Sequence, residues 1–365
     1  MRIERKCAPK TSIYVLSDIH YAGPTETRHY HGHHAPLSQN RLKEMAHSAY
    51  IRHIWIANAI GNNYLLDDFI ARVQEPDYVV ANGDYSCDMA CIGVADDATC
   101  ESAQTCLTKL RHHFGKTFVA TIGDHELGKL SLYGKRGGMR VASLARAQTE
   151  LGLKPFWQSQ IGRYSLIGIT SSLVALPAFA PDQLPQERQQ WEEARRTHLA
   201  EITTFFNDLP PDQKVVIFCH DPTALPYLWA LPPIAAKAKQ IEITLIGHLH
   251  SKVIFWKSKL LAGIPAIRFL GYSAHRMASA LNQARLWKHF NVSFCRSLAG
   301  IQLFKDGGYC RLLLDPTGQS PIEVEDHKLA WRKQRPPPQP GPLAQPSQSW
   351  QTKPDAVINT ETIPT

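Results

Sequence analysis

The stretch "TFVATIGDHELG", residues 117–128, joins a short apolar run to a cluster of ionisable side chains. Residues 118–122 are expected to form a buried β-strand, because apolar and β-branched residues fill the run and a turn residue follows it. The strand end then carries Asp124, His125 and Glu126 in succession. Placing two carboxylates and an imidazole together is costly unless a positive charge lies beside them. The stretch therefore poses the question of what positively charged group this strand end binds.

The same arrangement recurs along the chain and predicts the fold class. Short apolar runs that end in polar residues are expected to be buried strands, and they lie at 12–20, 76–84, 117–126, 164–172, 214–222, 241–250 and 266–273. Helical patterns precede three of them, at 62–73, 101–114 and 186–209; the last places Trp191, Ala194, Leu199, Ile202 and Phe206 near one face. Alternating strands and helices predict an α/β fold, in which functional residues gather at the carboxyl ends of strands.

Composition narrows the class of protein further. The chain has 365 residues, 44% of them hydrophobic and 20% charged, which is ordinary for a globular protein. No uninterrupted apolar stretch reaches the roughly 18 residues of a spanning helix. The charged N-terminus leads into a short apolar run that ends in "SDIH", so we expect a strand there and not a signal peptide. A cytoplasmic location with mostly reduced cysteines is predicted, and the net charge of +8 favours anionic partners.

The polar strand ends together form a pattern of metal ligands. They are Asp18 and His20, Asp84, Asp124 with His125, His220, and His248 with His250. Five strands that each end in Asp or His are hard to explain as solvated turns. Mixed imidazole and carboxylate ligands suit Mn, Fe, Zn or Ni. Because the set exceeds what one tetrahedral ion needs, we expect two ions bridged by a shared carboxylate.

The blocks "DIH", "NGD", "IGDHE", "CH" and "GHLH", all within residues 16–250, resemble the motifs of the calcineurin-like metallophosphoesterase superfamily in type and order. The resemblance implies a four-layer α-β-β-α sandwich of two mixed sheets. It implies two divalent or mixed-valence ions. By the same resemblance, Asp18, His20 and His250 hold one metal, Asp84 bridges, and Asp124, His220 and His248 hold the second.

The resemblance also implies an activity. The chain would be a metal-dependent phosphoesterase, a hydrolase that acts on phosphoric ester or anhydride bonds. A metal-bridging hydroxide would attack phosphorus in line, and His125 would contact the phosphate and protonate the leaving oxygen. Two ions about 3.5–4 Å apart can clamp the attacking and leaving oxygens of such a displacement.

Two residues of the "GDHE" block leave alternatives open. The family usually has Asn at the position of Asp124. The added charge predicts either tighter binding of a second ion that is then a weaker Lewis acid, or a preference for a trivalent ion. Glu126 is expected to orient the site from behind, hydrogen-bonded to His125 or to the backbone, or else to be an ordinary strand-end carboxylate.

A single domain over residues 1–330 is predicted, with insertions at about 21–70 and 85–105 and a disordered Pro/Gln-rich tail at 333–365. The tract from His29 to His34 either contacts substrate or a metal, or is a solvated loop. The insert cysteines allow a structural metal, a redox pair or free thiols; they are Cys87, Cys91, Cys100 and Cys106. Residues 300–315 are expected to form a hairpin with a Gly-Gly turn.

The segment 251–305 contains nine Lys and Arg residues and no Asp or Glu. Within it, residues 274–294 fit a helix that has Met277, Leu281, Ala284, Trp287 and Phe294 roughly on one face. Such a helix can lie on an anionic membrane surface, or it can pack on the core with its basic residues facing water.

The substrate class is accordingly left broad: a phosphomonoester, phosphodiester or diphosphate, on a small molecule or a membrane-associated lipid. A nucleotide or nucleic-acid phosphodiesterase is the alternative within the enzyme class. A non-catalytic scaffold is disfavoured, because every ligand position holds a competent side chain. The oligomeric state is not predicted.

Overall fold

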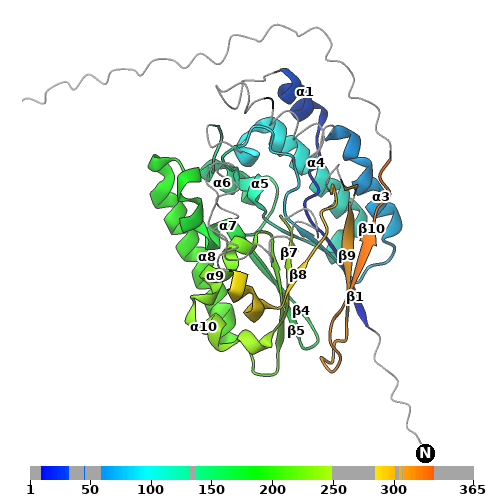
Figure 1. The fold of residues 1–365 in the computed structure, drawn as a ribbon, viewed down its shortest axis with the longest axis vertical. Coiled ribbons are helices and arrows are strands. Elements are labelled where there is room, and N and C mark those ends of the chain that lie inside the picture. The colour runs from blue at the N-terminus through cyan, green and yellow to red at the C-terminus, as the bar shows by residue number, and fades with distance from the viewer. Residues whose placement is uncertain are drawn as a thin grey trace, which may run out of the picture.

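The computed structural model describes residues 10–32, 45, 59–131, 136–248, 284–300, 304–305 and 307–332. Two five-stranded sheets form its centre, in the strand orders β10-β9-β1-β2-β3 and β4-β5-β6-β7-β8 (Figure 1). The first sheet consists of β1 (Thr11–Leu16), β2 (Tyr78–Asn82), β3 (Phe118–Thr121), β9 (Gly308–Leu314) and β10 (Glu323–Lys328). The second consists of β4 (Phe156–Ile161), β5 (Tyr164–Ile169), β6 (Lys214–Cys219), β7 (Ile241–Ile246) and β8 (Val292–Phe294).

Both sheets are mixed, as predicted. Strands β1, β2 and β3 run parallel, whereas β9 runs antiparallel to both β1 and β10. Strands β5 to β8 run parallel, and β4 runs antiparallel to β5. In each sheet the parallel strands therefore deliver their carboxyl ends to one edge.

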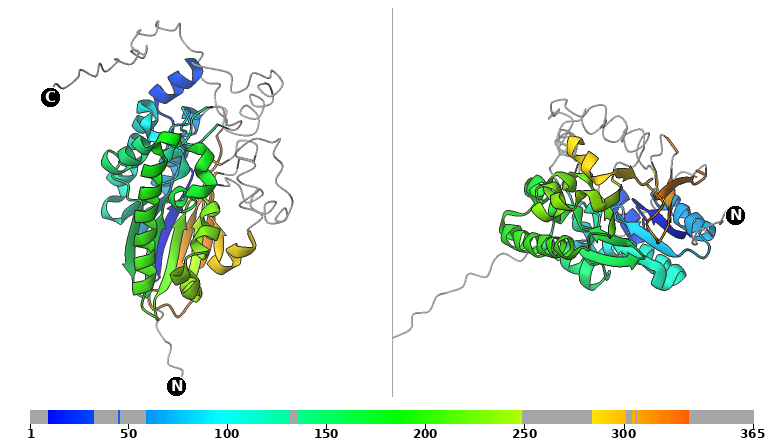
Figure 2. Two further views of the ribbon diagram at one scale, coloured as in Figure 1. Left: turned by 90° about the vertical axis from the view of Figure 1, so that its left-hand side faces the viewer. Right: turned by 90° about the horizontal axis from the view of Figure 1, so that it is seen from below.

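The alternation of side chains along each strand explains the four layers. Val80 of β2 packs in the cluster between the sheets with Val216 and Phe218 of β6. The neighbouring residues Val79 and Ile217 belong to the larger cluster that includes the helices. Successive strand residues point to opposite faces, so each sheet packs on the other sheet with one face and on helices with the other. In Figures 1 and 2, α3 and α4 flank the first sheet and α8 to α10 flank the second.

The three predicted helices are present. They are α3 (Tyr64–Arg72), α4 (Asp97–Phe114) and α8 (Arg188–Asp208), and α8 buries Trp191, Ile202 and Phe206 as its pattern requires. The other α-helices within the described residues are α1 (Pro24–Gly32), α5 (Asp124–Leu127), α6 (Val141–Thr149), α7 (Ser171–Val174), α9 (Leu225–Trp229) and α10 (Pro232–Ala236). Short 3₁₀ helices are η1 (Ile60–Asn62), η2 (Gly93–Ala95), η3 (Gly115–Thr117), η4 (Leu176–Asp182), η5 (Pro185–Glu187), η6 (Pro222–Ala224), η7 (Ala238–Gln240) and η9 (Ala284–Phe290).

Two local predictions are wrong. The expected helix over 274–294 ends in strand β8, which pairs with β7, and its described part before β8 is the 3₁₀ helix η9. Trp287 and Phe294 are buried in the core, while Arg285 and Lys288 face solvent. For this part of the segment, the structure therefore agrees with the alternative in which the apolar residues pack on the core and the basic residues face water. The expected Gly-Gly hairpin is replaced by strand β9 between β1 and β10, because the apolar side chains of β9 fill the core between the sheets.

Other predictions fall outside the described residues: His250, the strand at 266–273, residues 274–283 of the basic segment and the tail at 333–365. The side chains from His29 to His34 also lie outside them. The predicted domain boundaries and insertions stay predictions. Cys87, Cys91, Cys100 and Cys106 are free thiols. Across the described ranges, no helix combines the length and apolar character that crossing a membrane requires.

Candidate metal centre

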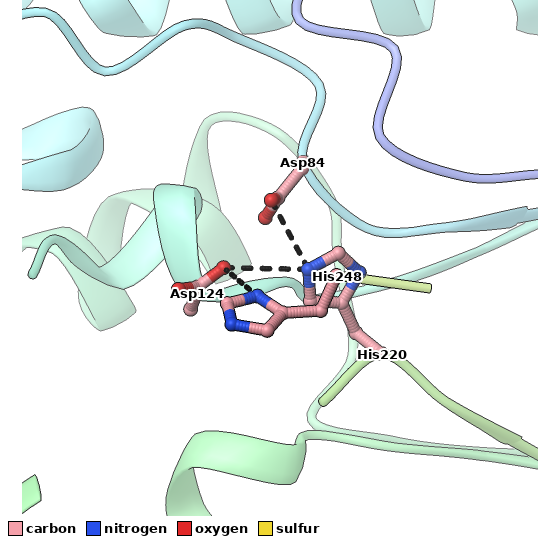
Figure 3. A group of neighbouring side chains, drawn as sticks. All are labelled: Asp84, Asp124, His220 and His248. Atoms are coloured by element: carbon pink, nitrogen blue, oxygen red, sulfur yellow. Dashed lines mark ion pairs between the residues drawn. The ribbon is translucent and has the colours of Figure 1, made fainter. Parts of the chain in front are cut away.

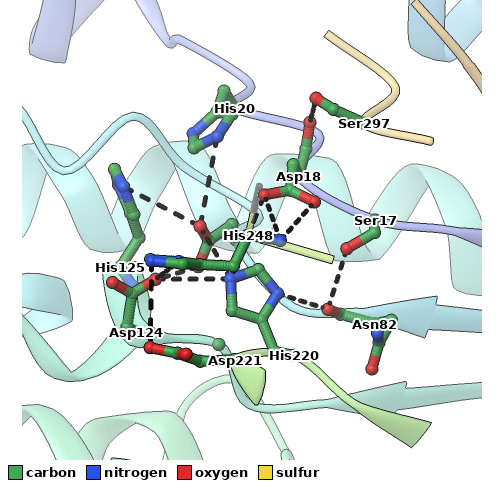
Figure 4. A network of polar contacts seen from close by, with 12 residues as sticks. Ser17, Asp18, His20, Asn82, Asp124, His125, His220, Asp221, His248 and Ser297 are labelled. Atoms are coloured by element: carbon green, nitrogen blue, oxygen red, sulfur yellow. Dashed lines mark hydrogen bonds and ion pairs between the residues drawn. The ribbon is translucent and has the colours of Figure 1, made fainter. Parts of the chain in front are cut away.

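The polar strand ends of both sheets converge at one edge of the molecule. Asp18 and His20 follow β1, Asp84 follows β2, and α5 places Asp124 and His125 directly after β3. The second sheet contributes His220 after β6 and His248 after β7. Figure 4 shows six of them turned toward one another: Asp18, His20, Asp124, His125, His220 and His248. His250 lies outside the described residues.

Four of these side chains form the tightest cluster, and both sheets contribute to it. Nε2 of His220 lies 3.1 Å from Oδ2 of Asp84 and 3.3 Å from Oδ1 of Asp124. Nδ1 of His248 lies 3.4 Å from the same oxygen of Asp124 (Figure 3). One potential ligand atom from each of the four residues lies within 4.8 Å of the other three. The four side chains therefore converge on one shared point.

Asp84 also belongs to a second group, with His20 and His125. Its Oδ2 lies 4.0 Å from Nε2 of His20 and 3.8 Å from Nε2 of His125. Asp84 is thus the one residue common to both groups, which is the place that a bridging carboxylate would take.

Asp18 lies beside the first cluster and belongs to neither group. Its two carboxylate oxygens accept the backbone N–H of His248 at 3.0 and 3.2 Å. Its Oδ1 lies 4.0 Å from Nε2 of His220. The carboxylate of Asp18 therefore links the end of β1 to the end of β7, across the two sheets.

The ring orientations of the histidines follow a common rule. Nδ1 faces a backbone carbonyl oxygen in His20, His125 and His220: that of Ser86 at 3.3 Å, of Cys87 at 2.9 Å and of Asn82 at 2.7 Å. An Nδ1–H that donates to a carbonyl leaves Nε2 with a lone pair directed into the cluster. His248 is reversed, with Nδ1 toward Asp124 and Nε2 3.8 Å from Oδ2 of Asp221.

The backbone at these strand ends is conformationally demanding. Asp18, His20, Asp84 and His248 all have positive φ, between 48° and 61°. Such residues typically cost of order 1–3 kcal/mol each and cluster at functional sites. Gly83 has φ +89°, and a Cβ there would lie 2.6 Å from Cα of Gly123. The "NGD" block therefore needs glycine to bring β2 against the turn after β3.

The electrostatics favour a positive charge inside the first cluster. Burial alone would lower the pKa of His220, yet the carboxylates of Asp84 and Asp18 raise it well above its usual range. Burial and Asp124 act to raise the pKa of Asp84, but His220 and His125 lower it overall. The carboxylates around His220 therefore favour a positive charge at the place that a metal cation would take.

Glu126 acts on the backbone of the site. Its Oε2 accepts the N–H of Gly123 at 2.8 Å and of Asp84 at 3.0 Å, and its Oε1 accepts the N–H of Tyr85 at 2.8 Å. The sequence predicted that Glu126 would hydrogen-bond either His125 or the backbone, and these three hydrogen bonds are to the backbone. Burial and the nearby Asp84 raise the pKa of Glu126 to about 7 despite these hydrogen bonds. Glu126 thereby ties the strand end of β2 to that of β3.

Sequence reasoning missed two residues that contact the cluster. Asp221 faces His248 as described, and Lys129 donates from Nζ to Oδ2 of Asp124 at 2.9 Å. Asp221 directly follows His220, and Lys129 follows the "GDHELG" stretch, so both were adjacent to quoted motifs. Asp221 follows β6 as closely as Asp18 follows β1, but it was not selected because the motif block ends at His220, whereas Lys129 lies beyond α5 and away from the strand ends.

The residues present fit a metal ion. Oδ2 of Asp84, Nε2 of His220 and Nδ1 of His248 are buried and make no hydrogen bond within the described part of the chain. Buried polar atoms of this kind are costly unless something satisfies them. Imidazole nitrogens and carboxylate oxygens are the donors that Mn, Fe, Zn and Ni accept. A divalent ion would satisfy all three atoms at once.

Comparison with known proteins identifies the family. No curated protein sequence matches the chain. Similar solved structures include a dimetal phosphatase from Danio rerio, with 11% identity, TM-score 0.46 and coverage of 88% of this chain and 97% of the other. Phosphopantetheinyl hydrolase from Mycobacterium tuberculosis shows 14% identity, TM-score 0.33 and coverage of 66% and 83%. GAP50, the anchor in the inner membrane complex of Plasmodium, shows 9% identity, TM-score 0.34 and coverage of 91% of both chains.

The family model described as calcineurin-like phosphoesterase matches residues 11–252, which include every described residue of the two groups. The predicted family is therefore confirmed: this chain belongs to the calcineurin-like phosphoesterases and is a metal-dependent phosphoesterase.

Proposed function

We propose that the chain hydrolyses a phosphoric ester or anhydride bond with two metal ions held where the strand ends of the two sheets meet. The first ion is assigned to Asp18, His20 and His250, and Asp84 is shared. The second is assigned to Asp124, His220 and His248. The observation that carries the proposal is the convergence of Asp84, Asp124, His220 and His248, whose ligand atoms lie within 4.8 Å of one another.

Two divalent ions at this place supply positive charge against phosphoryl oxygens and make water nucleophilic near neutral pH. The chain's own part is to hold the donors in place before substrate arrives. Glu126 fixes the backbone of Gly123 and Asp84 through hydrogen bonds, and Asp18 fixes that of His248. Donors fixed in this way need little reorganisation during the reaction.

His125 is assigned as the general acid. Its Nδ1–H donates to the carbonyl oxygen of Cys87, so Nε2 faces the cluster. Burial and Lys129 lower the pKa of His125 to about 4, so the free site holds a neutral imidazole. A phosphoryl dianion beside Nε2 favours the imidazolium form. Nε2 then gives its proton to the leaving oxygen as the bond from phosphorus to that oxygen breaks and the bond from phosphorus to the water oxygen forms.

The substrate proposal stays at the level of a phosphomonoester, phosphodiester or diphosphate. A lipid phosphate and peripheral contact with an anionic membrane rest on the nine basic residues of 251–305. Trp287 and Phe294, two of the apolar residues that a membrane-lying helix would expose, are buried. The cytoplasmic location likewise stays a proposal.

Hydrolysis assays test the function. The purified full chain is stripped with EDTA and assayed on p-nitrophenyl phosphate and bis-p-nitrophenyl phosphate, with and without Mn²⁺ or Zn²⁺. Metal-dependent release of nitrophenol is expected, and the preferred reporter separates monoesterase from diesterase. Matched panels of a lysophosphatidic acid, a lipid diphosphate and a cyclic nucleotide then distinguish lipid from nucleotide substrates. No turnover on any of them with metal added would contradict the proposal.

Asp315→Asn is the matched control variant. Asp315 is also a buried aspartate, but it accepts hydrogen bonds only in the turn between β9 and β10, from Thr317 and Ser320. Its replacement should leave metal-dependent turnover within about twofold of wild type, because its hydrogen bonds lie in a turn apart from the strand-end cluster.

A further inference from the structure

The two carboxylate oxygens of Asp124 face different partners. Oδ1 lies 3.3 Å from Nε2 of His220 and 3.4 Å from Nδ1 of His248, at the convergence point of the first cluster. Oδ2 accepts a hydrogen bond from Nζ of Lys129 at 2.9 Å. Asp124 is buried, whereas the Lys129 side chain is 22% exposed. One oxygen of Asp124 is thus directed to the cluster and the other to an ammonium group.

The fold brings Lys129 back to Asp124. Helix α5 ends at Leu127, and Gly128 follows with φ +86°. A Cβ on Gly128 would lie 2.6 Å from the carbonyl oxygen of Gly138 and 2.8 Å from the backbone nitrogen of Gly93, so only glycine fits this crossing. Leu130, the residue after Lys129, is fixed by its N–H, which donates to Oδ2 of Asp182 at 3.0 Å. Lys129 is therefore held between two anchored positions, and its contact does not depend on a mobile surface side chain alone.

Lys129 also acts electrostatically on the rest of the site. It is among the groups that lower the pKa of His20, His125 and Asp124. Its charge therefore acts on the imidazoles of the site as well as on the carboxylate that it contacts.

We infer that Lys129 is a positioning residue that keeps Asp124 a one-oxygen ligand of reduced charge. The inference rests on the proposed metal-dependent function. An ammonium at hydrogen-bond distance offsets much of the negative charge of a carboxylate. With Oδ2 occupied, only Oδ1 is directed toward the ion, whereas a carboxylate without this partner can turn both oxygens to a cation. Toward the ion, the Asp124–Lys129 pair behaves like a neutral oxygen donor, and this favours a divalent ion over a trivalent one.

The chain offers a matched control pair. Lys109 of α4 donates to Asp67 of α3 at 2.8 Å, almost the same distance. Both side chains are more exposed, at 38% and 57%, and neither belongs to a group of converging ligands. If the Lys129 contact were only an ordinary ion pair, its removal would have the same small effect as removal of the Lys109 contact.

A double-mutant cycle on metal affinity tests the inference. EDTA-treated full-length protein is titrated with Mn²⁺ and with Zn²⁺ by calorimetry, for wild type, Lys129→Met, Asp124→Asn and the double variant. Lys129→Met should tighten the weaker apparent Kd about tenfold, and Asp124→Asn should weaken it about tenfold, because each leaves one charge of the pair uncompensated. The double variant should return to within about threefold of wild type. Lys129→Arg should stay near wild type, because it keeps the charge.

The outcomes separate this inference from the proposed function. Wild type that binds two ions and hydrolyses the reporters, together with a Lys129→Met Kd as unchanged as that of Lys109→Met or a double variant whose Kd differs from wild type by more than about threefold, would overturn the inference alone. Wild type that binds no metal and turns over no reporter would overturn both. Thermal unfolding of each metal-free variant identifies any that fail to fold. If Asp124→Asn does not fold, the comparison of the metal Kd of Lys129→Arg with that of Lys129→Met tests the inference without it.

Discussion

Two buried histidines, His220 and His198, illustrate what separates a functional site from a structural one. Both are almost fully inaccessible to solvent. Nε2 of His220 faces the carboxylates of Asp84 and Asp124, and the pKa of His220 is raised. Nε2 of His198, on α8, accepts the backbone N–H of Thr170 at 3.2 Å, and burial lowers the pKa of His198 to about 3. Burial therefore does not mark the site, whereas convergence of carboxylates on the imidazole does.

The difference between the site around His220 and the structural His198 predicts that substitutions at the two places affect different properties. Substitutions of the ligands in the strand-end cluster should weaken metal binding and lower turnover, because these are the side chains that converge on one point. Substitution of His198 should change stability and its pH dependence and leave turnover intact.

The largest effect is expected for Asp84→Asn, since Asp84 is common to both groups. We expect metal-dependent turnover to fall by about 10³-fold or more, the loss typical of a key charge-stabilising group. The fold should persist, because the amide oxygen of Asn can still accept the N–H of His125 that Oδ1 accepts at 3.0 Å. Reporter hydrolysis and thermal unfolding measure the two. Turnover of Asp84→Asn within tenfold of wild type would contradict the assignment of Asp84 as a metal ligand.

His125→Gln comes next. A positioned general acid typically contributes about 10²–10⁴-fold, so kcat should fall in that range while the metal content stays that of wild type. The loss should be smaller for a reporter with a good leaving group, p-nitrophenol, than for an alkyl phosphate, because the better leaving group needs less protonation. Equal losses on both reporters would argue that His125 binds phosphate without donating a proton.

Glu126→Gln tests support of the backbone behind the ligands. An amide NH₂ must replace one oxygen that accepts a backbone N–H, which leaves unsatisfied donors at a cost of about 1–3 kcal/mol. Metal affinity should fall about 10–100-fold, as for other groups that orient ligands. Calorimetric titration and urea unfolding measure these effects. Glu187→Gln is the control, because Glu187 accepts one backbone N–H, from Val141, in the outer helical layer. A Glu126→Gln Kd equal to that of this control would refute the supporting role.

The smallest effect concerns stability at the structural histidine. Because the folded-state pKa of His198 lies below the unfolded value of about 6.5, its stabilising effect is complete above pH 6.5 and is lost as the pH falls toward 3. The free energy of unfolding of wild type minus that of His198→Gln should decrease by about 2 kcal/mol from pH 7 to pH 5. Urea unfolding of metal-free protein at both pH values provides the measurement. If the free energies of unfolding of wild type and His198→Gln change equally with pH, His198 does not titrate as described. Loss of turnover in His198→Gln would contradict the assignment of His198 to a structural role.

Much of the fold and the site was predictable because a single rule governs both. Apolar runs that end in Asp or His predicted the parallel strands β1, β2, β3, β6 and β7, and the carboxyl ends of those strands meet at one edge. The strands that were missed follow other rules: β4 is a half-exposed edge strand, β10 is a mostly exposed, charged edge strand, and β8 has three residues. They pair with β5, β9 and β7 respectively, and periodicity along the chain does not reveal these partners.

Two residues of the site, Lys129 and Asp221, were also missed because their contacts depend on the three-dimensional fold. Lys129 reaches Asp124 only because Gly128 turns the chain in the left-handed region. Asp221 accepts the N–H of Thr223 at the start of η6, so in the sequence it fits an ordinary helix cap. That its other oxygen faces His248 depends on how β6 and β7 are aligned, which is a property of the sheet and not of the local sequence.

The most direct test of the central claim is the number of metal ions that the strand-end cluster binds. EDTA-stripped wild type, Asp84→Asn and His198→Gln are equilibrated with Mn²⁺ or Zn²⁺, and the bound metal per chain is measured after removal of free ion. The account predicts two ions per chain for wild type and His198→Gln and fewer than one at full occupancy for Asp84→Asn. Equal metal content in wild type and Asp84→Asn, or none in wild type, would contradict it.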